Sequence, residues 1–405
     1  MTDSTIPGKS SLPPPPAARA IGRKPRMSRF LRMLVTITTL VHIPFAIGVA
    51  EAARRFGLPS PWGISLGLTA VGIGFFLGRA RAGMYDRRRH PLFVKFVDIP
   101  YFIHWCACVF TLVPCVVTTL LYPIVQLARG EPPMPPAAFY GWTYALGVVV
   151  AGYGILIRRR VFKVRQITVK IPDLPKDFEG FRIAHLSDLH IGATTPREWG
   201  HRWARAANAA APDVTVVTGD MVTSGTEFYE DIADVLGALV AKDGTYVSMG
   251  NHDYFGDGEP LIAKIRARGP KVLRNEGVFL SRGDAKLYLC AIDDTWTKRD
   301  DMDAALAGRQ DGVPTVLLAH DPERFRTSSK RDVELTLSGH THGGQIAVPF
   351  LSQQLSLSHL THHFHQGIYV KGRSTLYVHP GLGTTGPPIR LGVAPAVVIL
   401  TLTAA

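Results

Sequence analysis

The sequence predicts a chain of two structural classes: an α-helical membrane region with four spans, followed by a layered α/β domain. Four long apolar segments lie within the first 160 residues, and from about residue 163 short β-branched runs alternate with Ala-rich, charged helical stretches. We therefore expect three parts: a disordered, basic and Pro-rich tail at 1–28, a four-helix transmembrane region at 29–160, and the α/β domain at 161–405.

The excess positive charge of the chain lies in its first half. Residues 1–170 hold 22 Lys and Arg against 5 Asp and Glu, and residues 171–405 hold 23 against 27, so the halves carry +17 and −4 and sum to +13. A protein that binds DNA or RNA should carry its basic patch on the folded domain. We therefore expect no nucleic-acid partner.

The four cysteines are few and unevenly placed. Cys106, Cys108 and Cys115 lie in one apolar segment, and Cys290 lies alone in the second half. This set predicts neither a disulfide framework nor a thiolate zinc site. A reducing compartment is compatible with it.

The four apolar segments are Leu34–Ala50, Trp62–Leu77, Ile99–Leu121 and Phe139–Ile157. All but the second reach or approach the ~20 residues of a spanning helix, and the second becomes long enough with its flanks. None shows the polar stripe of a helix that faces water on one side. Two alternatives are four buried helices of a soluble bundle and a cleaved secretory signal at residues 26–50.

The flanking charges predict the orientation of these spans. Lys and Arg number seven before the first span, two, six and one in the three loops, and six after the fourth. Because cytoplasmic loops collect Lys and Arg, we expect four crossings with both termini and the α/β domain in the cytoplasm. His42 and His104 fall within spans, where we expect neutral rings bonded to neighbouring helices rather than groups that mark a pathway.

Five predicted strands of the α/β domain are followed by Asp, Asn or His. The strands are Arg182–Leu186, Val214–Thr218, Thr245–Met249, Thr315–Ala319 and Leu335–Ser338, and the residues after them are Asp188, His190, Asp220, Asn251, His252, Asp253, His320, His340 and His342. Ligands bind at the carboxyl ends of strands in open α/β sheets. Carboxylate, amide and imidazole groups without thiolate suit Mn²⁺, Fe or Zn²⁺. Seven such ligands with one shared carboxylate would hold two ions about 3.5–4 Å apart.

The stretch SGHTHGGQ at 338–345 places two histidines two residues apart among glycines. A strand would put both imidazoles on one face, and the glycines would let a backbone or an ion come close. A ligating histidine is neutral and oriented by a second partner, which this spacing allows. We therefore expect the two histidines to be metal ligands, together with the Asp, Asn and His residues that follow the other four strands.

The order of these blocks, D-x-H, G-D, G-N-H-D, a lone His and G-H-x-H, resembles the calcineurin-like metallophosphoesterases over about residues 163–405. The stretch GLGTTGPPIR at 381–390 resembles the membrane-attached branch of that family, related to bacterial UDP-diacylglucosamine and general phosphodiester hydrolases. The resemblance implies a pair of mixed β-sheets sandwiched between helices, in a protein of a bacterial inner or plasma membrane.

The resemblance also implies the roles of the site residues. Asp188, His190 and His342 would hold one metal, Asn251, His320 and His340 the other, and Asp220 would bridge the two. His252 would be the general acid for the leaving oxygen, supported by Asp253. The cofactors would be two divalent ions, Mn, Fe or Zn, with Mn favoured.

The chain departs from the family pattern in two places. Met221-Val222-Thr223 follows Gly219-Asp220 where relatives often have a further acidic residue, and His379-Pro380 stands where the branch more often has an arginine. The His-rich stretch at 359–365 is either a loop that rims the site or a further metal or substrate contact. Lys371 and Arg390 are expected at the surface.

The predicted function is that of a membrane-anchored dinuclear-metal phosphoesterase. It would hydrolyse a phosphodiester, lipid-linked or nucleotide-linked, at the cytoplasmic face by attack of a metal-bridging hydroxide. Its partners would be a phosphate-ester substrate, such as a lipid, and the bilayer. The alternative is a non-enzymatic membrane transporter or sensor with a regulatory metal-binding domain.

Overall fold

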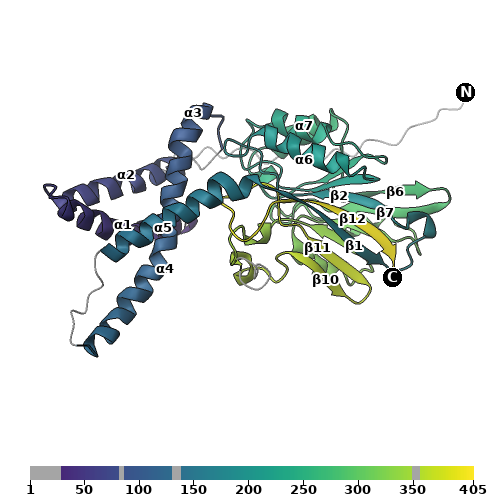
Figure 1. The fold of residues 1–405 in the computed structure, drawn as a ribbon. Helices are drawn as coiled ribbons and strands as arrows, with labels where there is room; N and C mark the ends of the chain where they lie inside the picture. The colour runs from purple at the N-terminus through teal and green to yellow at the C-terminus, as the bar shows by residue number, and fades with distance from the viewer. Residues whose placement is uncertain (1–28, 82–85, 130–137, 349–355) are drawn as a thin grey trace, which may run out of the picture.

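The structure, a computed structural model, describes residues 29–81, 86–129, 138–348 and 356–405. The tail predicted at 1–28 lies outside the described residues. Figure 1 shows the helical region at one end of the molecule and the α/β domain at the other, joined where α5 leads into the domain. The two predicted structural classes, apolar helices followed by an α/β domain, are therefore confirmed.

Four helices of the first region are long and apolar enough to span a membrane. They are α1 (Arg29–Arg55), α2 (Pro61–Arg81), α4 (Ile99–Leu127, preceded by the short helix α3, Pro91–Phe93, and the π-helical turn Val94–Asp98) and α5 (Ala138–Gly152, continued by the π-helical turn Tyr153–Ile157). Only 11–33% of the most apolar window of each candidate span is buried. A soluble bundle would bury these faces, so the exposure favours membrane spans. Helix α1 packs against α2, α4 and α5.

The described part of the second region holds two six-stranded mixed sheets. The first has the order β1 (Lys163–Ile171), β12 (Ala396–Ala404), β2 (Arg182–Leu186), β3 (Val214–Thr218), β4 (Thr245–Ser248) and β5 (Lys271–Val272). The second has the order β10 (Gly367–Lys371), β11 (Ser374–Val378), β9 (Leu335–Ser338), β8 (Thr315–Leu318), β7 (Ala285–Ala291) and β6 (Glu276–Arg282).

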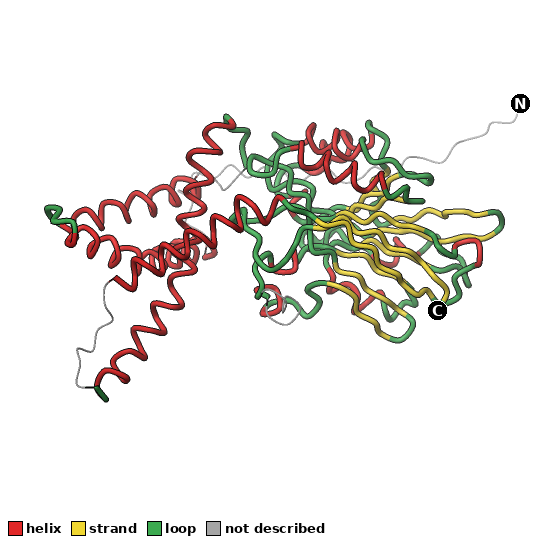
Figure 2. The backbone as a smooth tube through the Cα atoms, in the orientation of Figure 1, coloured by secondary structure: helices red, strands yellow, loops and turns green. Residues whose placement is uncertain are grey.

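The two sheets pack face to face and are covered by helices, as Figure 2 shows. On β3, Val216 packs into the core between the sheets, while the next residue, Val217, packs toward the helices. This is the alternation expected of a strand buried on both faces. The helices of the first sheet are α6 (Arg197–Ala209), α7 (Tyr229–Gly237) and α8 (Gly258–Arg266), and shorter helices are α9 (Met302–Leu306) and α10 (Phe325–Ser328). The predicted sandwich is confirmed.

The strand directions turn the ligand-bearing ends toward the membrane helices. Strand β1 starts three residues after the 3-10 turn Arg158–Arg160 that follows α5, β12 runs parallel to β1, and β2 runs antiparallel to β12. Because β3 and β4 are parallel to β2, all three run back toward the helical region. Their carboxyl ends therefore face the bundle (Figure 1).

Candidate metal centre

Each candidate ligand follows a strand at a sharp backbone turn. Five of them have left-handed φ angles: Asp188 (53°), His190 (45°), Asp220 (52°), His340 (72°) and His342 (54°). A non-glycine residue held in this region costs about 1–3 kcal/mol, and such strain gathers at functional sites. These five residues follow β2, β3 and β9, so left-handed turns aim side chains from three strand ends into the site.

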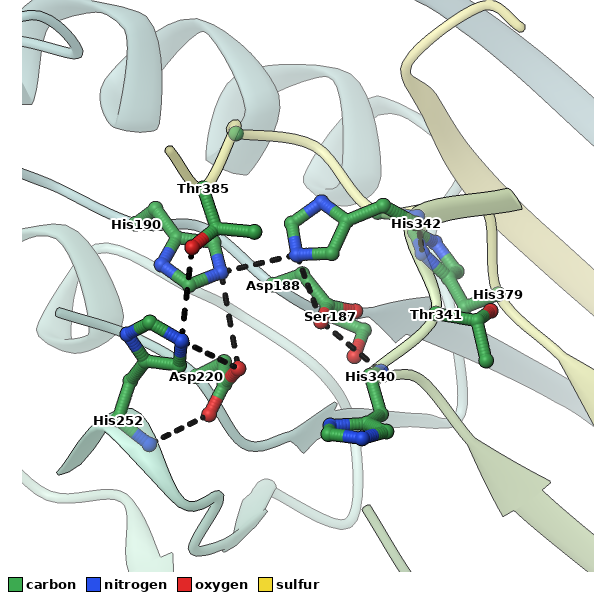
Figure 3. Close-up of polar contacts among 12 residues, drawn as sticks. Ser187, Asp188, His190, Asp220, His252, His340, Thr341, His342, His379 and Thr385 are labelled. Carbon is green, nitrogen blue, oxygen red and sulfur yellow. Dashed lines mark hydrogen bonds and ion pairs between the residues drawn. The ribbon is translucent and has the colours of Figure 1, made fainter. Parts of the chain in front are cut away.

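One group of four ligands surrounds a common point. The metal-binding atoms of Asp188, His190, Asp220 and His342 lie within 4.8 Å of one another. The Nε2 atoms of His190 and His342 are 3.0 Å apart, and His342 Nε2 lies 3.3 Å from Asp188 Oδ1. His190 Nε2 is 3.6 Å from Asp220 Oδ2 (Figure 3).

A second group shares the Asp220 carboxylate with the first. Asp220, His320 and His340 also place their metal-binding atoms within 4.8 Å of one another. His320 Nε2 lies 3.2 Å from Asp220 Oδ2, the same oxygen that faces His190. The other oxygen, Asp220 Oδ1, accepts the His252 backbone N–H at 3.0 Å, which fixes the carboxylate so that Oδ2 points between the two groups.

The residues fit divalent metal ions. Among the described residues, Asp188 Oδ2 and Asn251 Oδ1 are buried side-chain oxygens without a hydrogen-bond partner. Buried polar atoms nearly always have a partner, and oxygens set beside imidazole nitrogens are typical ligands of divalent cations. Asn251, from the end of β4, is 3% exposed. The donor set is therefore oxygen and nitrogen with no thiolate.

The electrostatics of the site favour neutral rings at His190, His340 and His342 and an ion pair between Asp220 and His320. Burial lowers the pKa of His190 to about 3 and that of His340 to about 4, and it holds the pKa of His342 well below its usual value. A neutral imidazole is the form that binds metal. Burial disfavours charge on Asp220 and His320 too, but their mutual attraction holds the Asp220 pKa well below its usual value and raises the His320 pKa to about 10.

His252 lies beside the first group with one ring nitrogen fixed. Its Nδ1 is 2.6 Å from the Thr223 carbonyl oxygen, so Nδ1 carries a hydrogen. Its Nε2 then faces the site, 4.0 Å from Asp220 Oδ2 and 3.5 Å from Thr385 Oγ1 (Figure 3). The side chain is 17% exposed, so a bound molecule can reach it.

Asp253 supports the site through the backbone rather than through the His252 ring. Its carboxylate accepts N–H groups of Asp220, Met221, Val222 and Gly250 at 2.8–3.2 Å. These bonds tie the turn after β3 to the turn after β4. The expected support of His252 by Asp253 is therefore indirect, and the direct partner of the ring is Thr223.

Thr223 stands in the segment where relatives often have an acidic residue. Besides its carbonyl bond to His252, its hydroxyl donates to the His190 carbonyl oxygen at 3.1 Å. The segment Met221-Val222-Thr223 thus contacts two site residues without a carboxylate.

Arg390 is not at the surface, which corrects the expectation from sequence. It is 0% exposed, its guanidinium donates to the carbonyl oxygens of Pro380 and Gly383 at 2.7–3.1 Å, and Nη2 lies 3.4 Å from His342 Nδ1. Arg390 therefore holds the turn after β11 against His342. The GLGTTGPPIR stretch carried the signal for such a role, whereas Lys371 is exposed as expected.

The His-rich stretch at 359–365 borders the second group. The ring of His362 is centred 5.6 Å from that of His340, and the His365 carbonyl oxygen accepts the Thr341 hydroxyl at 2.5 Å. His362 is partly exposed and His363 is exposed. These contacts place the stretch at the rim of the site.

The site is also in contact with the membrane region. Asp86, in the loop between α2 and α3, accepts the Ala193 backbone N–H at 3.0 Å just beyond His190. Arg88 of the same loop forms an ion pair with Asp231 at 2.6 Å. From the exit of α5, Arg159 donates to the Thr194 carbonyl oxygen at 2.9 Å. Side chains from the loop between α2 and α3 and from the exit of α5 thus contact the domain beside His190.

The arrangement defines a metal-dependent phosphoesterase that carries membrane helices. The model of the family described as "Calcineurin-like phosphoesterase" matches residues 181–344. The chain is 30% identical over 255 residues to "Uncharacterized metallophosphoesterase YkuE" of Bacillus subtilis, covering 62% of this chain and 89% of that one. It is 32% identical to "Transmembrane protein with metallophosphoesterase domain" of Danio rerio over 257 residues and of Bos taurus over 274 residues.

The matches cover 60% and 64% of this chain and 58% and 61% of the two vertebrate proteins, less than two thirds of their length. The chain belongs to the calcineurin-like metallophosphoesterase family. It is therefore a metal-dependent phosphoric ester hydrolase, and the non-enzymatic alternative is set aside.

Proposed function

We propose that this protein uses two divalent ions to hydrolyse a lipid-linked phosphodiester at the cytoplasmic surface of the membrane. The observation that carries the proposal is Asp220 Oδ2, which lies 3.2 Å from His320 Nε2 and 3.6 Å from His190 Nε2. A carboxylate oxygen shared by two ligand groups is the arrangement that a pair of close metal ions requires.

The two groups divide the ligands as the family pattern does. Asp188, His190 and His342 would hold one ion, Asn251, His320 and His340 the other, and Asp220 would serve both. When bound, the ions would supply a water of lowered pKa as the nucleophile and neutralise the phosphoryl oxygens. Mn²⁺ is the ion we favour for an oxygen-rich and nitrogen-rich donor set.

His252 is the proposed general acid. The bond from Nδ1–H to the Thr223 carbonyl leaves Nε2 as the atom that exchanges a proton with the substrate. A leaving alkoxide is a strong base and needs that proton as its bond to phosphorus breaks. The partial exposure of the ring gives the leaving group access to Nε2.

Arg390 is a proposed positioning residue. Its guanidinium donates to the carbonyl oxygens of Pro380 and Gly383 and lies beside the His342 ring, so it packs the turn after β11 against that residue. Groups that orient a metal-binding histidine contribute typically 10–100-fold to metal affinity or activity.

The position of the site supports a substrate that comes from the bilayer. The ligand-bearing strand ends face the membrane helices, and Asp86, Arg88 and Arg159 join those helices to the rim of the site. The loop charges favour the cytoplasmic side for this end of the molecule. Basic loops also attract anionic lipid headgroups.

The test of the proposal is hydrolysis by full-length protein in detergent, stripped of metal and resupplied with Mn²⁺. Phosphodiesters of one headgroup with short and long acyl chains are compared, and a water-soluble chromogenic diester measures the intrinsic activity. We expect Mn²⁺-dependent turnover with a kcat/KM that rises with chain length. Equal kcat/KM for short and long chains would refute the lipid-linked substrate. Inactivity of protein with two bound ions toward all the diesters would refute the diesterase itself.

A further inference from the structure

We propose that His42, His104 and Cys108 form a second metal site, inside the membrane bundle, for a tetrahedral divalent cation of the Zn²⁺ class. The side-chain nitrogens and sulfur of these residues lie within 4.8 Å of one another. His42 comes from α1, and His104 and Cys108 lie one turn apart on α4. The site is distinct from the phosphoesterase centre at the strand ends.

The ring of His42 presents a lone pair to the cluster. Its Nδ1 lies 2.6 Å from the Thr38 carbonyl oxygen, which can only accept a hydrogen bond. Nδ1 therefore carries the hydrogen, and Nε2 of the neutral ring is a free base. A hydrogen bond that fixes the tautomer through the other ring nitrogen is typical of metal-binding histidines.

The ring of His104 faces that lone pair directly. Its Nε2 is 3.2 Å from His42 Nε2, and its Nδ1 is 2.8 Å from the Tyr144 hydroxyl on α5. Two nitrogens bound to one tetrahedral Zn²⁺ at about 2.0–2.1 Å each lie about 3.3–3.4 Å apart. The observed separation differs from that value by only a few tenths of an ångström.

Cys108 supplies the third ligand. Its sulfur is 3.9 Å from both Nδ1 and Nε2 of His104, and the side chain is 0% exposed. A thiolate 2.3 Å from the same ion would lie about 3.5 Å from Nε2, so the sulfur would shift toward that nitrogen on binding. Binding would release the thiol proton, because the thiolate is the form that ligates metal.

Helix α2 approaches the two nitrogens with a glycine. Gly72 of α2 is buried, and a Cβ at this position would lie 3.0 Å from both His42 Nε2 and His104 Nε2. A larger residue here would press on both rings. Helices α1, α2, α4 and α5 thus all contribute to the cluster.

The phosphoesterase centre of the same chain provides a comparison for the distance between the two imidazole nitrogens. There the Nε2 atoms of His190 and His342 face each other at 3.0 Å, in a family that depends on metal. The membrane cluster repeats this facing pair and adds a sulfur. The cysteines alone predicted no thiolate site, but the fold brings two histidines to one of them.

The test uses full-length protein in detergent, loaded with Co²⁺ and freed of unbound ions. A thiolate bound to Co²⁺ gives an intense near-ultraviolet charge-transfer band, which the sulfur-free phosphoesterase centre cannot give. We expect the band in the wild type and in Asp220→Ala, with His42→Ala and Cys108→Ser each losing it. Cys106→Ser, at a buried cysteine two residues away, should retain it.

Zinc content and activity complete the test. We expect the His42→Ala and Cys108→Ser proteins to lose one Zn²⁺ per chain while their Mn²⁺-dependent hydrolysis stays within about twofold of wild type, which also shows that they are folded. Asp220→Ala should lose hydrolysis and keep the band, so failure of one site is separable from failure of the other. Absence of the band from the wild type would show that the histidines form only a neutral hydrogen-bonded pair, and its persistence in Cys108→Ser would refute the site by placing the thiolate at another cysteine.

Discussion

The α/β domain and the membrane bundle both bring two histidine Nε2 atoms together, at 3.0 Å in His190–His342 and 3.2 Å in His42–His104. The surroundings of the two pairs differ. The first pair lies beside two aspartates at strained turns, and one of them is shared with a second ligand group. The second pair lies on regular helices, with Cys108 as the only further ligand among the described residues.

The different surroundings of the two histidine pairs suit different kinds of metal site. A strained turn with a shared carboxylate can hold two ions and leave room for a substrate, because His252 and the rim remain accessible. A closed cluster between helices can hold one ion and tie the helices together, as structural zinc sites do. The following experiments test that contrast, from the largest expected effect to the smallest.

The largest effect is expected for Asp220→Ala. This substitution removes the shared carboxylate, which has no counterpart in the membrane cluster. Mn²⁺-dependent kcat/KM should fall more than about 10³-fold, beyond the 10²–10³ of a single electrostatic contact, because both ions lose a ligand. Asp213 precedes the first residue of β3, at the end of the strand opposite to Asp220. The Asp213→Ala protein should therefore keep its hydrolytic activity. Similar losses in both variants would mean that the effect comes from folding.

His252→Ala should lower kcat about 10²–10⁴-fold while bound Mn²⁺ is unchanged, because the ring donates a proton and is not among the metal ligands. The loss should be smaller for a nitrophenol leaving group than for an alkyl alcohol, since a weakly basic leaving group needs no proton. His201→Ala, on α6, is the control. An equal loss for both leaving groups would contradict the general-acid role.

Gly339→Ala tests the close packing around the first ligand group. A Cβ here would lie 1.9 Å from Ser187 Oγ and 2.4 Å from Asp188 Oδ2, so Asp188 must move. We expect about 1–3 kcal/mol lower stability and a 10–100-fold weaker Mn²⁺ affinity, measured by thermal unfolding and metal titration. Unchanged Mn²⁺ affinity would show that the position of Asp188 is not critical.

The smallest effect on the metal centre is expected for Asp86→Asn, at the junction of the two regions. Burial raises the Asp86 pKa from 3.8 to about 6, against the opposing charges of Arg79 and Arg89. The folded protein thus binds this proton more tightly than the unfolded chain, and ionisation lowers its stability as pH rises from about 4 to 6. Asparagine can still accept the Ala193 N–H but cannot ionise.

The Asp86→Asn protein should therefore match the wild type near pH 4 and exceed its stability by up to about 3 kcal/mol above pH 6. Unfolding in detergent at pH 4.5 and pH 8 measures this difference. The same stability difference at both pH values would exclude Asp86 ionisation as its cause.

The sequence predicts the ligand-bearing strands well because their ends are marked. Strands β2, β3 and β9 have the predicted bounds, since each apolar run stops at a turn that carries Gly, Ser or Asp. Strands β6 and β10 were not predicted, because their half-exposed residues do not form a continuous apolar run. The short β5 has only two residues.

The two histidine pairs also differ in how far the sequence predicts them. The strand-end ligands fall within short motifs, so their convergence follows from the direction of the strands. His42 and His104 lie 62 positions apart on helices, and only helix packing decides whether they face each other. Arg390 is different, because the carbonyl oxygens that it binds, those of Pro380 and Gly383, lie only 10 and 7 residues before it, and the fold decides that its side chain turns inward.

The most direct test of the central claim is the electron paramagnetic resonance spectrum of the protein loaded with two equivalents of Mn²⁺. Two ions that share Asp220 should be magnetically coupled and give a broad multiline spectrum, which Asp220→Ala converts to that of isolated Mn²⁺. A wild-type spectrum of isolated Mn²⁺ only, in a sample that hydrolyses the chromogenic diester at its full rate, would contradict the dinuclear centre.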